Sequence, residues 1–309
     1  MHPYERVAYV EANGIRIAYE TFGDRNDPPV LLVTGLAVQM LVWPDALCEQ
    51  LAARGYYVIR SDNRDVGLST HLDSPTELGL LAILRHKAPY TITDMATDIV
   101  GLIEALALGP VHLVGASMGG FISQTVALDR PDVVRSLTLI MTSTGSRKVG
   151  QPRPVVAWRM IRQRPSVDRD SAITAALETF RRIGSPGFPF EEALIRDIAG
   201  RSYDRSYNIA GRRRQLAAAV AQPNRTARLR SLAVPTLVIH GLDDPVVRPS
   251  GGRALAAAIP GARWIGYAGM GHNLPEPLWP QVVDELDGHF AAASAAEPKP
   301  AGPEPVEPK

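Results

Sequence analysis

The chain has 309 residues, of which 45% are hydrophobic and 21% are charged, and its formal net charge is +1. This composition is ordinary for a globular protein, and a charge near zero offers no general attraction for nucleic acid or an anionic membrane. No apolar run reaches about 18 residues, the length that a membrane-spanning helix needs. The N-terminus lacks the basic-then-apolar order of a signal peptide, so we expect a cytoplasmic protein without a membrane span.

The only cysteine, Cys48, excludes an internal disulfide and a metal site built from several cysteines. Leucines lie close to it in a predicted helix. This setting favours a buried, apolar role for the side chain over that of a reactive thiol.

The N-terminal segment predicts a β-hairpin followed by a buried strand. Residues 6–12 and 15–20 alternate between apolar and polar side chains, and Asn13-Gly14 between them suits a tight turn with positive φ. The uninterrupted apolar run at 30–33 is bounded by prolines and a glycine, which is typical of a strand buried on both faces.

After this strand, helical segments and short apolar runs alternate along the chain. Helices are predicted over 44–54, 93–108, 118–130, 250–259 and 276–290, the second after a start signal at Thr93-Asp94. Strands are predicted over 57–60, 111–114, 137–141, 236–239 and 262–267. This order indicates an α/β fold with a mostly parallel, doubly wound sheet that has helices on both faces.

The alternation breaks at residues 145–230, where only helix-like segments separated by proline and glycine occur. We therefore expect a helical cap over 145–230, inserted between two strands of a core formed by residues 1–144 and 231–290. The remaining residues, 291–309, are rich in Ala, Pro, Glu and Lys without large apolar side chains, and they are predicted to be disordered.

The predicted cap has an unusual charge balance. It holds 17 arginines and one lysine against seven acidic residues, which gives a net charge of +11. A basic cap could steer anionic substrates or dock on an acidic surface. We favour the alternative, that the arginines coat the solvent-facing sides of helices and pair with acidic residues of the core.

A G-x-S-x-G motif at 115–119 lies between the strand at 111–114 and the helix that follows. This is the context of a nucleophile elbow, in which a serine, here Ser117, sits in a strained turn at the carboxyl end of a strand. The glycines on either side leave room for the turn. The alternative is that Ser117 merely caps the helix. We favour the nucleophile, because the partners that a nucleophilic serine needs also occur in the chain.

A nucleophilic serine needs a base, and in this kind of fold the order along the chain is serine, acid, histidine. Of the seven histidines, His240, His272 and His289 follow Ser117. His272 lies in a glycine-rich loop after the strand at 262–267, which can bring its imidazole close to the serine. His240 ends a buried strand and suits a structural role, and His289 is expected at the surface of a helix. We therefore predict His272 as the base.

The acid is predicted in the loop after the strand at 236–239, which contains Asp243 and Asp244. A carboxylate there can hold the imidazole in one tautomer and stabilise its cation. The other loop in which such folds place an acid, at 142–144, has no carboxylate. We choose Asp244, which precedes a proline, and interpret Asp243 as a turn residue. The alternative is that both aspartates merely form the turn.

With these residues in place, the chain resembles the α/β-hydrolase superfamily over about residues 5–290. More narrowly, it resembles esterases of the aclacinomycin methylesterase type and related lipase-like carboxylesterases. The segments that carry the resemblance are 32–36 (LVTGL), 61–69 (SDNRDVGLS), 114–120 (VGASMGG), and 244–245 (DP) with 269–272 (GMGH). The family pattern also favours Asp244 over Asp243 as the acid.

The resemblance implies an oxyanion hole made by the backbone amides of Leu36 and Met118. Many relatives have His-Gly where this chain has Thr34-Gly35, a departure that keeps the backbone donor but affects the loop around Leu36. The stretch 62–69 is interpreted as structural, with polar side chains that brace loops beneath the site.

Together these residues predict serine-dependent hydrolysis of a small or medium carboxylic ester through an acyl-enzyme intermediate, with no metal or cofactor. Perhydrolases and lactonases of the same superfamily keep the serine triad and are alternatives. An alternative of a different functional class is a non-catalytic receptor that binds a ligand beneath the cap. The complete set of catalytic residues favours an enzyme over this receptor. The expected partner is a small-molecule ester rather than a nucleic acid, and the sequence leaves the oligomeric state open.

Overall fold

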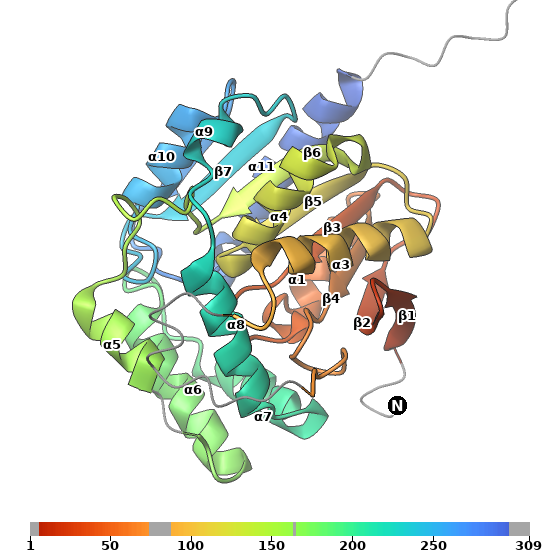
Figure 1. Cartoon of the computed structure of the whole chain (residues 1–309). Coiled ribbons are helices and arrows are strands. Elements are labelled where there is room, and N and C mark those ends of the chain that lie inside the picture. Colours follow the sequence, from red (N-terminus) through yellow and green to blue (C-terminus); the bar gives the residue numbers. More distant parts are fainter. Residues whose placement is uncertain (1–5, 74–87, 163–164, 297–309) are drawn as a thin grey trace, which may run out of the picture.

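The computed structural model describes residues 6–73, 88–162 and 165–296. Within these residues, eight strands form one sheet in the order β1-β2-β4-β3-β5-β6-β7-β8 (Figure 1). The strands are β1 Ala8–Ala12, β2 Ile15–Phe22, β3 Pro29–Val33, β4 Tyr57–Ser61, β5 Val111–Ala116, β6 Val134–Ile140, β7 Thr236–Gly241 and β8 Arg263–Tyr267. Strand β2 pairs antiparallel with β1 and β4, and the other five pairings are parallel, so the predicted mostly parallel sheet is confirmed.

Helices cover both faces of the sheet, and a separate apolar core lies between each face and the helices that cover it. The helices that flank the sheet are α1 Asp45–Ala52, α3 Ile92–Ala105, α4 Met118–Asp129, α10 Ser250–Ala258 and α11 Trp279–Ala295. In β3, Leu31 and Val33 belong to the core shared with α3, α4 and α10, whereas Val30 and Leu32 belong to the core shared with α1 and α11. Successive strand side chains point to opposite faces, so both faces of this strand are buried, as the apolar run predicted.

Between β6 and β7 the described chain is helical. The helices there are α5 Pro154–Arg162, α6 Arg169–Ile183, α7 Glu192–Arg205, α8 Ile209–Ala221 and α9 Thr226–Leu229. Figure 1 shows α5 to α8, here called the cap helices, gathered beyond one end of the sheet. Short 3-10 helices occur elsewhere in the chain, at η1 Met40–Val42, η2 Pro131–Val133 and η3 Glu276–Leu278.

The arginines of this helical region pair with acidic residues, but the prediction that solvent-facing arginines pair with acids of the core is confirmed only in part. Arg205 and Arg214 form buried ion pairs with Asp62 and Asp65 of the core, at 2.9 and 2.6 Å. Other arginines form exposed pairs with acids of the cap helices themselves, namely Arg169, Arg181, Arg182, Arg196 and Arg201.

The start of α3 differs from the prediction. The N-cap is Thr91 rather than the predicted signal at Thr93-Asp94. Oγ1 of Thr91 accepts a hydrogen bond from the backbone N–H of Asp94, and the Asp94 carboxylate accepts one from the N–H of Thr91, at 3.2 and 2.7 Å. This reciprocal capping box satisfies two donors at once, which places the N-cap at Thr91, two residues before Thr93.

The C-terminal helix runs further than predicted. It ends at Ala295, inside the segment 291–309 that was predicted to be disordered. Ala293 is buried, so the apolar face of α11 continues past the expected boundary. The rest of that segment, 297–309, lies outside the described residues. None of the helices that the structure describes is long and apolar enough to cross a membrane.

Candidate active site

The structure brings together the three residues predicted as nucleophile, base and acid. Ser117 follows β5, Asp244 follows β7 and His272 follows β8, all at the carboxyl end of the parallel strands. Nε2 of His272 lies 3.0 Å from Oγ of Ser117, and Nδ1 lies 2.7 Å from Oδ2 of Asp244. A carboxylate only accepts hydrogen bonds, so Nδ1 carries the proton and Nε2 is left to accept the proton of the serine hydroxyl.

Ser117 has a backbone conformation that residues with side chains rarely adopt, with φ 54° and ψ −118°. Its N–H donates to the carbonyl of Ile140 at 3.0 Å, and its carbonyl accepts from Oγ1 of Thr142 at 2.8 Å. The end of β6 and the residues after it therefore hold the strained turn in place. The side chain makes no capping hydrogen bond to α4, which argues against the alternative that Ser117 merely caps this helix.

Close packing explains the glycines of the motif. A methyl group on Gly119 would lie 2.3 Å from the carbonyl oxygen of Val33, and one on Gly115 would lie 2.5 Å from the carbonyl oxygen of Gly119. Contacts this short are forbidden, so only glycine lets the start of α4 approach β3 and β5 closely enough to form the elbow.

The two neighbouring aspartates make different contacts. Oδ2 of Asp244 faces His272, while Oδ1 accepts from the backbone amides of Val246 and Val247 at 2.7 and 2.9 Å. The Asp243 carboxylate instead accepts from the N–H of Gly269 at 2.8 Å. Asp244 is thus the carboxylate oriented toward the imidazole, and Asp243 links two loops.

The two other histidines that follow Ser117 lie in the interior. Nε2 of His240 donates to the carbonyl of Val247 at 2.7 Å, in keeping with its predicted structural role, and burial lowers the pKa of His240. The prediction that His289 lies at the surface was wrong. His289 is 5% exposed, its Nε2 lies 3.3 Å from the carbonyl of Leu137, and burial lowers its pKa to about 4. It sits on the inner face of α11 because this face packs against β6.

The loop that carries His272 rests on the turn after α6. The N–H of His272 donates to the carbonyl of Ile183 at 2.7 Å, and the N–H of Gly271 donates to Oγ of Ser185 at 3.0 Å. A methyl group on Gly271 would lie 2.0 Å from the carbonyl oxygen of Gly184. The turn after α6 therefore supports the backbone of the loop that carries the imidazole, a contribution that no motif in the sequence indicated.

The residues predicted to form the oxyanion hole flank Ser117. Met118 is the first residue of α4, and Leu36 lies in the loop after β3. The neighbouring Gly35 is so close that a methyl group on it would lie 3.3 Å from Cβ of Ser117. Within the described residues, neither the Leu36 amide nor the Met118 amide donates to another group of the chain. Both amides are therefore available for an oxyanion.

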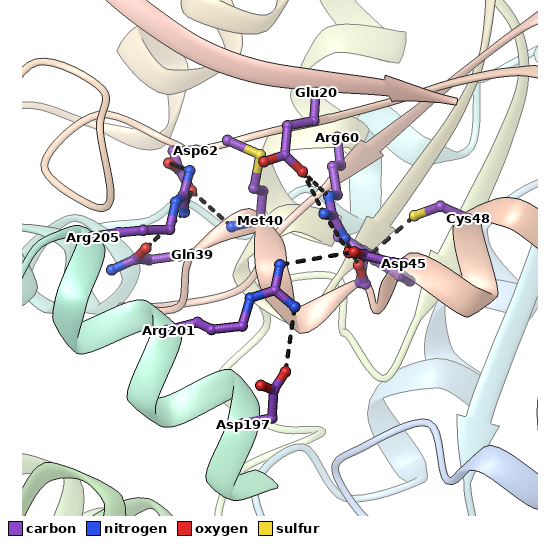
Figure 2. Close-up of polar contacts among 11 residues, drawn as sticks. Glu20, Gln39, Met40, Asp45, Cys48, Arg60, Asp62, Asp197, Arg201 and Arg205 are labelled. Carbon is purple, nitrogen blue, oxygen red and sulfur yellow. Dashed lines mark hydrogen bonds and ion pairs between the residues drawn. The ribbon is translucent and has the colours of Figure 1, made fainter. Parts of the chain in front are cut away.

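The stretch 62–69 braces these loops, as predicted. Nδ2 of Asn63 donates to the carbonyl oxygen and the hydroxyl of Thr34, at 3.1 and 3.0 Å. Oδ1 of Asp62 accepts from the N–H of Met40 at 2.7 Å. Figure 2 shows this carboxylate between Met40 and the guanidinium of Arg205 on α7, so the brace extends to a cap helix.

Cys48 is free and fully buried, as predicted, and its Sγ lies 3.7 Å from the carbonyl of Trp43. Burial raises the pKa of this thiol to about 12, so it stays protonated at neutral pH. Within the described part of the chain, no three His, Cys, Asp or Glu side chains lie close enough to hold a metal ion.

A cavity of about 510 Å³ lies where the cap helices meet the loops after β7 and β8. Phe180, Phe188 and Phe190 line it together with Asn273, the residue after His272. Trp158, which also belongs to the helical region, is 55% exposed.

Comparisons with known proteins agree with this architecture. Residues 28–276 match the alpha/beta hydrolase fold family. Rhodomycin D methylesterase DauP of Streptomyces sp. (strain C5) is 30% identical, over 89% of this chain and 95% of that protein. Rhodomycin D methylesterase DnrP of Streptomyces peucetius is 28% identical over the same shares.

Among solved structures, esterase RhEst1 from Rhodococcus sp. ECU1013 has the same fold. It superposes with a TM-score of 0.72 over 93% of this chain and 99% of that one, at 22% sequence identity. The predicted resemblance is thereby confirmed. The chain belongs to the α/β-hydrolase family.

Proposed function

We propose that this protein hydrolyses a small or medium carboxylic ester through an acyl-enzyme intermediate on Ser117. The observation that carries the proposal is the continuous hydrogen-bonded series from Oγ of Ser117 through His272 to Asp244, at 3.0 and 2.7 Å. Such a series supplies a nucleophile, its base and the group that orients the base.

In the proposed reaction, Oγ of Ser117 attacks the ester carbonyl while its proton passes to Nε2 of His272. Asp244 stabilises the imidazolium cation that forms. The tetrahedral intermediate collapses when His272 protonates the leaving alcohol, and the acyl group stays on Ser117. Water then attacks the acyl-enzyme with His272 again as the base, which releases the acid.

The negative charge on the carbonyl oxygen needs donors that are already in place. We assign the amides of Leu36 and Met118 to this role, because they flank Ser117 and make no other hydrogen bond within the described residues. Each donor of this kind lowers the barrier by about 3 kcal/mol.

Two features support the proposed substrate class. The relatives DauP and DnrP are named methylesterases, which favours an ester of a small alcohol. The cavity beside the loop of His272 is lined by charged side chains as well as by Phe180, Phe188 and Phe190, and we assign to these three rings the contact with an apolar part of the substrate. In this proposal, residues 145–230 form the cap, and residues 1–144 with 231–290 form the core. The cytoplasmic location stays a prediction from the sequence.

The test is hydrolysis of methyl and nitrophenyl esters of graded acyl length by the wild type and by Ser117→Ala. We expect turnover that falls by at least about 10⁴-fold in the variant. Ser123→Ala is the control, since Ser123 is a buried serine of α4, six residues after Ser117, and this variant should keep its activity. Negligible rates in the wild type, together with a ligand-dependent rise in Tm, would instead favour a receptor.

A further inference from the structure

The loop between β3 and η1, residues 34–39, carries the proposed donor Leu36 and is held by the cap helices. We infer that Gln215 of α8 is a positioning residue that sets the direction of the Leu36 amide, with Arg205 of α7 holding the far end of the same loop. This inference rests on the proposed function, because it concerns the oxyanion hole of that reaction.

The peptide group that carries the Leu36 N–H lies between two anchored peptide groups. On one side, the carbonyl of Thr34 accepts from Nδ2 of Asn63 at 3.1 Å. On the other side, the N–H of Ala37 donates to Oε1 of Gln215 at 2.7 Å. Fixing both neighbours restricts the torsions on either side of the peptide between them, and thereby the direction in which the Leu36 N–H points.

This loop needs external support, because its conformation is unfavourable by itself. Ala37 has φ 56°, in the left-handed region that favours glycine. Gly35 packs directly against Ser117, so a small displacement of the loop changes the distance between the nucleophile and the donor. A strained loop keeps one conformation only where its surroundings determine it.

Gln215 is suited to this task by its burial and its two fixed partners. It is fully buried, and its Nε2 donates to the carbonyl of Arg64 at 2.8 Å. An N–H can only donate and a carbonyl can only accept, so the two contacts fix the orientation of the amide. Arg64 is itself held by Asp98, at 2.5 and 2.6 Å. Gln215 thus ties the loop of Leu36 to the segment after β4, which the Arg64–Asp98 pair joins to α3.

The far end of the loop is attached to α7. Nη1 of Arg205 donates to Oε1 of Gln39 at 2.7 Å, and Nε2 of Gln39 donates to the carbonyls of Ser202 and Ser206 at 2.7 and 2.8 Å. Nη2 of Arg205 is 2.9 Å from Oδ2 of Asp62. Figure 2 shows Arg205, Gln39 and Asp62 facing one another beside Met40. Two cap helices thus hold the loop at two places.

The test compares kcat and KM of the wild type with those of Gln215→Met. This substitution keeps the side-chain volume but removes the acceptor for the Ala37 N–H. We expect kcat to fall about 10- to 100-fold, since small misplacements of reacting groups have effects of this size. KM should change by less than about three-fold, because the oxyanion forms only after substrate has bound. Inhibition by a trifluoromethyl ketone, whose adduct on serine carries an oxyanion, should weaken in parallel with kcat.

The matched control is Gln124→Met. Gln124 is also fully buried, and it bonds to the carbonyl of Ser143 and to Arg225, away from the loop of Leu36. Its kcat should stay within about two-fold of the wild type even where Tm falls. Gln215→Glu should recover most of kcat, because a buried carboxyl in its protonated form can both accept from the Ala37 N–H and donate to the Arg64 carbonyl. If Gln215→Met does not fold, Gln215→Asn takes its place in the test. This variant retains a polar amide but is one methylene shorter.

An unchanged kcat in Gln215→Met or Gln215→Asn, or an equal loss in Gln124→Met, would overturn the inference and leave the proposed function standing. The absence of ester turnover in the wild type would overturn the proposed function, and the inference with it.

Discussion

The two sides of the active site are built in different ways. The turn of Ser117 is formed within one short motif, between β5 and the start of α4. The loop of Leu36 is held by side chains far along the chain, since Ala37 and Gln215 are 178 positions apart and Gln39 and Arg205 are 166 apart. The nucleophile thus depends mainly on local geometry, whereas the oxyanion side depends on how the cap helices dock. Substitutions in the turn of Ser117 should abolish ester hydrolysis, whereas substitutions that loosen the loop of Leu36 should only lower its rate.

Apart from the loss of Ser117 itself, the largest effect is expected at the acid. Asp244→Asn should lower kcat by about 10⁴-fold, because an amide facing Nδ1 favours the wrong imidazole tautomer. Asp243→Asn is the control at the next position, and its kcat should stay within about three-fold, since Asp243 contacts the backbone of Gly269 rather than His272. Steady-state rates at saturating ester provide the measurement. Equal losses in the two variants would contradict the assignment of the acid.

Breaking the attachment on the oxyanion side should chiefly affect stability. Arg205→Met leaves Asp62 buried without its cation and should lower the free energy of unfolding by about 3–5 kcal/mol. Arg196→Met removes an exposed pair with Glu192 and should leave the urea midpoint nearly unchanged, because solvent screens such pairs. Urea unfolding of both variants tests the difference, and similar losses would mean that the buried pair contributes no more to stability than an exposed one.

A smaller effect on stability is expected from His112, a buried residue of β5, the strand that leads into the turn of Ser117. Burial lowers the pKa of His112 in β5 from 6.5 to about 3. The unfolded chain therefore takes up more protons than the folded chain as the pH falls through about 6.5, and stability is lost from there down to about 3. We expect this residue to contribute about 2 kcal/mol to the loss between pH 7 and pH 5.

The matching variant is His112→Gln, in which an amide that does not titrate replaces the imidazole bonded to Ser136. Urea unfolding at pH 7 and pH 5 should show a correspondingly smaller loss than in the wild type. The same pH dependence in both proteins would show that His112 is not the group responsible.

The sequence predicted the elbow side well for a physical reason. Ser117 and its glycines are neighbours, and the order of strands and helices places Asp244 and His272 at the same end of the sheet. Gln215 could not be found in this way, because it follows three arginines in a stretch typical of a solvent-facing helix. Only the docking of α8 makes it buried. The position of His289 was misjudged for the same reason, since packing against β6 decides which face of α11 is covered.

The most direct measurement is labelling of the intact protein with a fluorophosphonate, followed by digestion and mass spectrometry. An activated serine reacts rapidly with such a reagent because its base removes the hydroxyl proton. We predict a single adduct, on the peptide that contains Ser117. In His272→Ala, the labelling rate should fall to near the background rate. An adduct on a different residue, or an unchanged labelling rate in His272→Ala, would contradict the proposed roles of these two residues.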